Sequence, residues 1–174
     1  MILWITFVLC FLAQILQCLY PLPFTLFPFL PFIALTIMKK KLKVALYLSA
    51  LAGCVTDLLS SDPIGVSALN YTFLAALFYR FKSLFSEEEP LHLSLFTAFL
   101  SFSCTLFQFF LLFLFDRRVP FSGKWILADW IGMPVLDALY AFIWVAAPLS
   151  LVNYLRRMWM IFWLKRKRRF PKSP

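Results

Sequence analysis

The sequence predicts an all-α protein, a polytopic transmembrane bundle of about six helices with both ends on the cytoplasmic side. Hydrophobic residues make up 63% of the 174 residues and charged residues only 14%, whereas soluble domains carry roughly 45–50% and about 25%. The apolar residues are gathered in six segments separated by short polar breaks. The basic residues, which outnumber the acidic ones by 17 to 8, are concentrated in alternate breaks.

The first three apolar segments have the length or the boundaries of membrane helices. A helix that crosses a hydrocarbon core of about 30 Å needs on the order of 20 residues, and Ile2–Tyr20 has that length. The next segment, Leu22–Met38, carries prolines in its first half. Because proline is tolerated in the first turn of a helix but not in its interior, regular helix is expected from about Pro28 or Pro31. Leu42–Leu59 is the third predicted helix.

Three further segments complete the predicted bundle. Gly65–Phe81 is the fourth, and Leu91–Phe115 is long enough to cross the membrane with tilt. The last segment, Ile126–Val152, is too long for one crossing and contains a Gly-Met-Pro break. We therefore expect Trp125–Ile131 to lie at the membrane interface and a membrane helix to run from about Met133 to Val152.

Small residues mark where two of these helices could approach closely. Ser49 and Gly53 are four apart on the third segment, as are Ala50 and Cys54, and such spacing places small side chains on one helix face. Because no cysteines form a C-x-x-C pair, we expect no disulfide framework and no zinc site. All four are expected to be small buried side chains: Cys10, Cys18, Cys54 and Cys104.

The basic residues predict the orientation of the bundle. With the N-terminus inside, the cytoplasmic breaks and the C-terminal segment hold 14 of the 17 Lys and Arg residues. Because Lys and Arg that border membrane segments are retained on the cytoplasmic side, this distribution predicts that both ends lie inside. The net charge of +9 is then mainly a topology signal, so nucleic acid is not expected as a partner.

The chain divides into a predicted transmembrane domain over residues 1–156 and a basic, aromatic cytoplasmic tail over residues 157–174. Tryptophan prefers the headgroup level of a membrane, and each Lys or Arg near an anionic leaflet gains about 1 kcal/mol. The tail is therefore expected to bind membrane lipids, with an acidic cytoplasmic partner as the alternative. The expected anchor residues are Trp159, Trp163, Lys165, Arg166, Lys167, Arg168 and Arg169.

The sequence offers little for catalysis. It contains one histidine, His92, and no H-E-x-x-H, G-x-S-x-G or P-loop motif. A nucleophile needs a base and an orienting group around it, and no motif indicates such a set. We therefore expect no enzymatic activity, no cofactor and no metal site.

Two aspartates lie within or at the edge of apolar segments, Asp57 and Asp137. Charge at bilayer depth costs about 2.5–3.5 kcal/mol on insertion scales and usually has a function. Asp57 is followed by Ser-Ser-Asp-Pro-Ile-Gly, a composition typical of a turn, in which Ser61 or Asp62 would cap the next helix. Asp57 could hydrogen-bond to that turn, or it could make a polar contact in a pocket or partner interface.

The run Asp57–Leu69 (DLLSSDPIGVSAL) resembles the D-L-L-S-x-x-P-L-G-x-x-A-L signature of the MreD family of bacterial rod shape-determining membrane proteins. The resemblance extends over most of the chain. The glutamine pair Gln14-x-x-Gln17, the tyrosine of Asn70-Tyr71 and the Pro148 helix fall in the expected order, and chain length and helix number agree.

This resemblance implies a non-enzymatic scaffold of the cell-elongation machinery in the bacterial inner membrane. Family members work with MreC, a single-span protein, and with actin-like MreB, and they couple both to a RodA-type peptidoglycan synthase and its partner transpeptidase. Their architecture is similar to that of the S-components of energy-coupling-factor transporters. The resemblance implies an outward groove or pocket for MreC, shaped by Asp57, Pro63, Gly65 and Leu69; Asp137 is a further candidate because of its intramembrane position.

A small-solute-binding subunit of a membrane transporter is the alternative. The shared architecture and the scarcity of charge in the helices favour it. Against it, Ala13 is followed four residues later by Gln17 rather than by a second small residue, so the first helix lacks the docking pair that the resemblance to S-components would imply. Small-molecule pockets also need a few convergent polar groups.

Overall fold

The computed structural model describes residues 2–20, 26–60, 63–85, 90–114, 128–148, 150–151, 154–155 and 158–160, and within these ranges the secondary structure is helical, without strands. The elements are α1 (Ile2–Leu19), α2 (Leu30–Lys39), α3 (Leu42–Leu59), α4 (Val66–Phe78), the 3₁₀ helix η1 (Tyr79–Leu84), α5 (Pro90–Leu114), the π-helix η2 (Ala128–Gly132), α7 (Met133–Tyr140) and the π-helix η3 (Ala141–Ala146).

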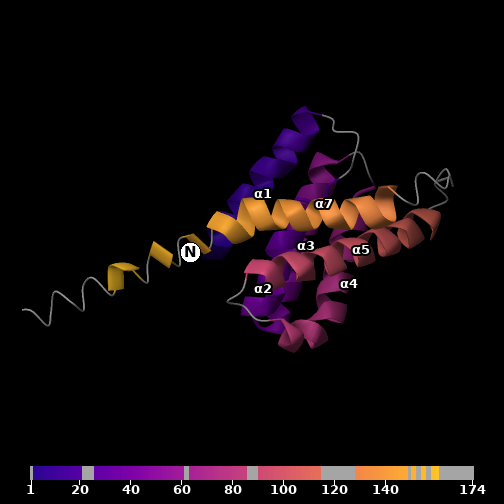
Figure 1. Cartoon of the computed structure of the whole chain (residues 1–174). Coiled ribbons are helices and arrows are strands. Elements are labelled where there is room, and N and C mark those ends of the chain that lie inside the picture. The colour runs from indigo at the N-terminus through magenta and orange to yellow at the C-terminus, as the bar shows by residue number, and fades with distance from the viewer. Residues whose placement is uncertain are drawn as a thin grey trace, which may run out of the picture.

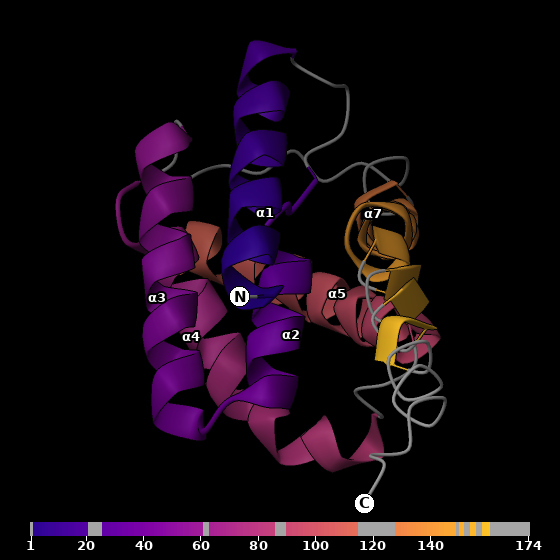
Figure 2. The same cartoon turned by 90° about the vertical axis from the view of Figure 1, so that its left-hand side faces the viewer.

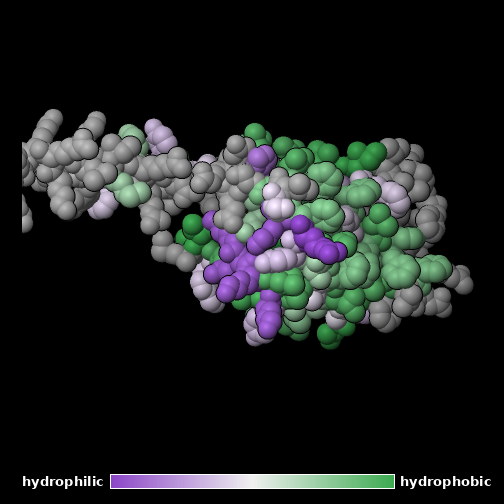
Figure 3. All heavy atoms as spheres, turned by 90° about the horizontal axis from the view of Figure 1, so that it is seen from below, coloured by the Kyte–Doolittle hydropathy of each residue, from purple (hydrophilic) through white to green (hydrophobic). Residues whose placement is uncertain are grey.

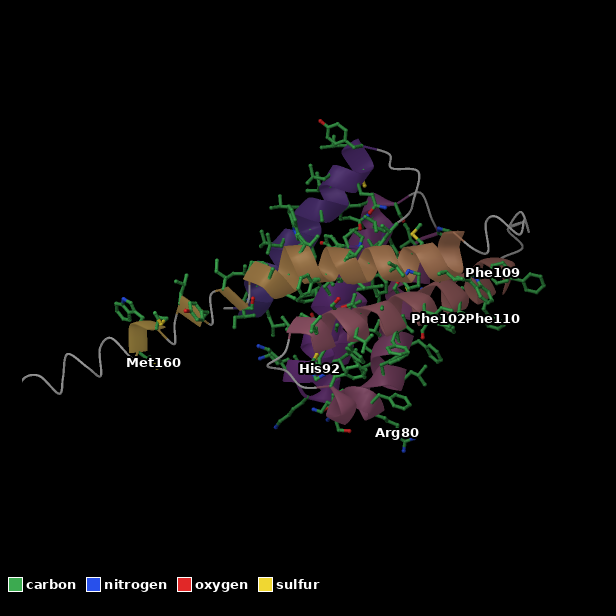
Figure 4. All side chains as sticks on the ribbon, in the orientation of Figure 1. Arg80, His92, Phe102, Phe109, Phe110 and Met160 are labelled. Carbon is green, nitrogen blue, oxygen red and sulfur yellow. The ribbon has the colours of Figure 1, made fainter. Side chains whose placement is uncertain are left out.

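Three of the helices, α1, α3 and α5, are long and apolar enough to cross a membrane. Their outward side chains are large and apolar, and in Figure 4 Phe102 and Phe110 project away from α5. A surface of this kind is stable in lipid rather than in water. The described residues therefore indicate a multi-pass membrane protein.

The short helix α2 lies at the centre of the bundle. Every residue from Leu30 to Met38 is buried, and α2 contacts α1, α3, α4 and α5 (Figure 2). A helix that is apolar on all sides belongs in the interior. It begins at Leu30, between Pro28 and Pro31, which confirms the start expected from the prolines.

Helices α4 and α5 run in opposite senses, as do α5 and α7. Figure 1 shows α5 and α7 side by side, crossing the group formed by α1 and α3. Between α4 and α5, Asn70 contacts Cys104 and the later Phe78 contacts the earlier Phe96. Between α5 and the C-terminal helix, Ser94 contacts Ala138 and the later Phe102 contacts the earlier Trp130. In each pair, moving forward along one helix means moving backward along the other.

Helices α3 and α4 approach each other closely at Gly53. A Cβ atom on Gly53 would lie 2.3 Å from the Cα of Ala68, so only glycine allows the two backbones to pack at this distance. Ser49 is also buried, which confirms the Ser49–Gly53 face. The expectation for the other small pair is wrong: Cys54 is exposed and Ala50 only half-buried, because that side of α3 faces outward.

The cysteine expectation is only half confirmed. Cys10 and Cys104 are buried, whereas Cys18 and Cys54 are exposed, and all four are free. In a membrane helix an outward apolar side chain meets lipid, so hydrophobic character does not by itself place a cysteine inside the bundle.

The C-terminal helix starts earlier than the sequence suggests. Helix α7 begins at Met133 as expected, but the π-helix η2 leads directly into it from Ala128. The Gly-Met-Pro sequence therefore does not interrupt the helical structure. The π-helix η2 ends at Gly132, and Pro134 is the second residue of α7.

Candidate functional site

Asp57 organises the start of α4. Its side chain is only 3% exposed. One carboxylate oxygen accepts the backbone N–H groups of Gly65 (2.9 Å) and Ala68 (3.2 Å), and the other accepts that of Ser67 (2.9 Å). The first N–H groups of a helix have no partner within the helix, and a carboxylate there is favoured by the helix dipole. Asp57 is thus an N-terminal cap contributed by the preceding helix.

The turn itself depends on Gly65. Its φ of +101° lies in the left-handed region, which side chains with a Cβ atom rarely adopt. Pro63 is half-buried and its carbonyl accepts the N–H of Val66 at 3.3 Å. Ser61 and Asp62, expected to cap the helix, lie outside the described residues. The hydrogen bonds in place favour the turn-bonding interpretation of Asp57.

The same turn carries apolar side chains that face outward. Leu58 is 76% exposed, Ile64 84% and Leu69 53%. Of the sequence candidates, Asp57, Pro63 and Gly65 therefore build the turn, whereas Leu69 is available on its surface. The exposed Ile64 was not among the candidates, although its place between Pro63 and Gly65 in a tight turn is a signal for it.

Asp137 lies in a second, separate site in α7. It is fully buried. One carboxylate oxygen accepts the backbone N–H of Phe27 at 3.2 Å and the other accepts the hydroxyl of Ser101 on α5. Asp137 therefore ties α7 to α5 and to the non-helical residues that precede α2.

Those non-helical residues have their backbone groups satisfied by side chains. The side-chain amide of Gln17 is assigned the orientation in which both of its ends are hydrogen-bonded. Its nitrogen then donates to the carbonyl of Leu26 (3.2 Å), and its oxygen accepts the N–H of Leu26 (3.1 Å). The hydroxyl of Tyr140 lies 3.5 Å from the carbonyl of Pro28. Non-helical backbone at membrane depth requires such partners. Asp137, Gln17 and Tyr140 thus hold the entry to α2.

A pocket of about 360 Å³ lies beside this entry, between α1, the residues before α2 and the C-terminal helix. Its lining is almost entirely carbon, and its polar side chains include Gln17 and Tyr140, which already contact the backbone. The lining residues are Ala13, Leu16, Gln17, Tyr20, Leu26, Pro28, Tyr140 and Trp144. Asp137 is not among them.

The bundle interior also contains hydrogen bonds between polar groups whose pairing the sequence did not predict. The amide nitrogen of Asn70 donates to the carbonyl of Cys104 at 3.2 Å, whereas the Asn70 amide oxygen finds no hydrogen-bond donor among the residues that the structure describes. The hydroxyl of Tyr71 hydrogen-bonds to Thr56. Asn70 and Tyr71 directly follow the run Asp57–Leu69, but their partners Cys104 and Thr56 are 34 and 15 residues away in the sequence.

The structure describes only part of the predicted membrane anchor. Trp159 is described and is 69% exposed, and in Figure 4 neighbouring Met160 stands away from the helices. Trp163, Lys165, Arg166, Lys167, Arg168 and Arg169 lie outside the described residues, so the anchor stays a prediction.

Among the residues that the structure describes, no group of three or more His, Cys, Asp or Glu side chains could hold a metal ion. No protein-family model, curated protein or solved structure matches the chain. The geometry of the two aspartate sites is therefore the basis for a functional proposal, together with the sequence resemblance.

Proposed function

We propose that this chain is a non-enzymatic, MreD-type scaffold of the bacterial inner membrane. It would bind an MreC-like single-span protein and link an MreB-type filament to a RodA-type synthase and its transpeptidase partner. The observation that carries the proposal is the turn after α3. Both carboxylate oxygens of Asp57 accept hydrogen bonds from backbone N–H groups, while the side chains of Leu58, Ile64 and Leu69 are exposed. A fixed turn that presents exposed apolar side chains suits a protein partner.

In this proposal the six apolar segments all cross the membrane, and both ends lie inside. The basic residues at Lys39–Lys43 and at Arg80 and Lys82 gather at one end of the bundle (Figure 3), which supports a common cytoplasmic side. The far ends of α1 and α3 meet, because the thiol of Cys18 lies 3.4 Å from the carbonyl of Leu59. The Asp57 turn then faces outward from the cell.

Co-purification tests the proposed partner site. We expect an MreC-like protein, co-expressed with the tagged chain, to be retained by the wild type and lost from the Ile64→Gln, Leu69→Gln double variant. Leu95→Gln with Leu139→Gln is the matched control, because Leu69, Leu95 and Leu139 are 53%, 53% and 52% exposed. Equal retention by all three proteins, or equal loss from both variants, would contradict the proposed site.

The apolar pocket favours a second candidate function, a small-solute-binding subunit of a transporter. Its lining, including Trp144, suits an apolar solute of modest size. A solute that raises the melting temperature of the wild type, but not of the Trp144→Ala variant, would support this function. A screen in which no solute stabilises the wild type selectively would exclude it.

A further inference from the structure

One end of the bundle concentrates positive charge from two parts of the chain. Helix α2 ends at Lys39 and α3 begins at Leu42, so Lys40 and Lys41 form the whole connection. Helix α2 also contacts η1, and Figure 3 shows the resulting hydrophilic patch within a largely hydrophobic surface. We call this patch the basic end, formed by Lys39, Lys40, Lys41, Lys43, Arg80 and Lys82.

The charges of the basic end are accessible. Lys40, Lys41 and Lys43 are exposed, and Arg80 projects away from the helices in Figure 4. Lys82 is held in place, since its ammonium group lies 3.3 Å from the Tyr79 hydroxyl and 4.6 Å from the centre of the Tyr79 ring. The acidic residues among the described ranges are Asp57, Asp129 and Asp137, in other elements. Nothing described at this end neutralises the patch.

Exposed apolar side chains adjoin these charges. Val44 and Tyr47 follow the lysines on α3, with Tyr47 71% exposed, and Leu77 and Phe81 flank Arg80, each 47% exposed. Helices α3 and α4 pack against each other, so these side chains lie on neighbouring helices. Positive charge beside membrane-facing apolar surface matches a ligand with an anionic head and apolar chains. An acidic protein segment would use only the charges.

We propose that the basic end is a binding site for anionic phospholipid, with the phosphate on the lysines and Arg80 and the acyl chains along the outward faces of α3 and α4. This site is separate from the Asp57 turn and does not depend on the proposed scaffold function. Each Lys or Arg near anionic headgroups contributes about 1 kcal/mol, so the loss of three lysines has a measurable effect.

Native mass spectrometry of the full chain in neutral detergent tests the site with phosphatidylglycerol and phosphatidylcholine of equal chain length. We expect Lys40→Gln, Lys41→Gln and Lys43→Gln together to weaken phosphatidylglycerol binding about tenfold or more. The control is Arg117→Gln, Arg118→Gln and Lys124→Gln, which removes the same charge from the segment between α5 and η2 and is expected to change binding less than about twofold. Equal losses in the two triple variants, or no loss, would overturn the site.

The apolar part of the proposal has its own matched pair. Tyr47→Ser is expected to weaken the binding of long-chain phosphatidylglycerol but not of a short-chain, water-soluble analogue. Tyr20→Ser is expected to leave both unchanged, since Tyr20 is equally exposed (70%) but follows the far end of α1. Equal effects of the two serine variants would overturn the acyl-chain contact. Equal binding of phosphatidylcholine, or tighter binding of a polyglutamate peptide than of phosphatidylglycerol, would overturn the lipid assignment.

Discussion

The two buried aspartates make an instructive contrast. Asp57 accepts three hydrogen bonds, all from backbone N–H groups that lie 8 to 11 residues further along the chain. Asp137 accepts one backbone N–H, from Phe27, which is 110 residues away, and one hydroxyl, from Ser101. Both carboxylates accept backbone N–H groups at the start of a helix. Asp57 does so for nearby residues, and Asp137 does so across the bundle.

The contrast teaches that a buried charge in a membrane protein need not mark an ion or substrate path. Backbone outside a helix needs hydrogen-bond partners at membrane depth, and a carboxylate can supply two acceptor oxygens at once. At Asp57 the result is a fixed turn at the surface of the bundle. At Asp137 the result is a connection between three segments in its interior.

The largest effect is expected at Asp57. Replacement by alanine leaves three N–H groups without their acceptor, and each such loss costs roughly 1–3 kcal/mol when buried. Because water reaches part of the turn, we expect Asp57→Ala to lower the free energy of unfolding by about 3 kcal/mol in mixed-micelle denaturation. A loss below about 1 kcal/mol would contradict the cap, since a single buried N–H already costs that much.

Asparagine separates the two sites most sharply. At position 57 the new amide NH₂ faces a backbone N–H, so Asp57→Asn is expected to cost about 2 kcal/mol. At position 137 the amide oxygen still accepts the Phe27 N–H and the NH₂ can donate to the Ser101 oxygen, so Asp137→Asn costs less than about 1 kcal/mol. The same unfolding assay measures both variants, and equal costs would contradict the assigned partners.

Gly65 tests the turn without touching the carboxylate. Nothing lies within 4 Å of a Cβ atom placed there, so only the positive φ opposes a side chain. Gly65→Ala is expected to cost about 1–2 kcal/mol, and Gly65→Asn about half of that, because asparagine tolerates this region better. If alanine and asparagine left the unfolding free energy unchanged, the turn would not have the described conformation.

An effect smaller than that of Asp57→Ala is expected at Ser101. Its hydroxyl donates to Asp137 across the bundle, so Ser101→Ala should cost about 1 kcal/mol. In the Asp137→Ala background the same change should add little, because residues that interact are not additive. A double-variant cycle in mixed micelles measures this coupling, and full additivity would show that the two side chains act independently.

The all-helical class, the start of α2 and the left-handed glycine could be predicted because each depends on local chemistry. Proline fixes φ and glycine permits a positive φ at their own positions, and the partners of Asp57 are only 8 to 11 residues further along the chain. The Ser49–Gly53 face was predictable from spacing alone. The choice between the two interpretations of Asp57 required the coordinates.

The second site could not be predicted from sequence. Gln17, Phe27, Ser101 and Asp137 lie in four separate segments, and no spacing rule relates them. The expected break at Gly132–Pro134 was wrong because the π-helix η2, which includes Gly132, continues directly into α7, which includes Pro134. Burial was misjudged at Cys18 and Cys54 because an apolar side chain in a membrane helix can face either protein or lipid.

The central claim is that the Asp57 turn presents a partner-binding surface. A photo-crosslinking residue at Ile64, which is 84% exposed, tests it in intact membranes, with the same residue at Leu139 as the control. The account predicts an adduct with an MreC-like protein from position 64 and none from position 139. An adduct from position 139 alone, or no adduct with such a protein from position 64, would contradict it.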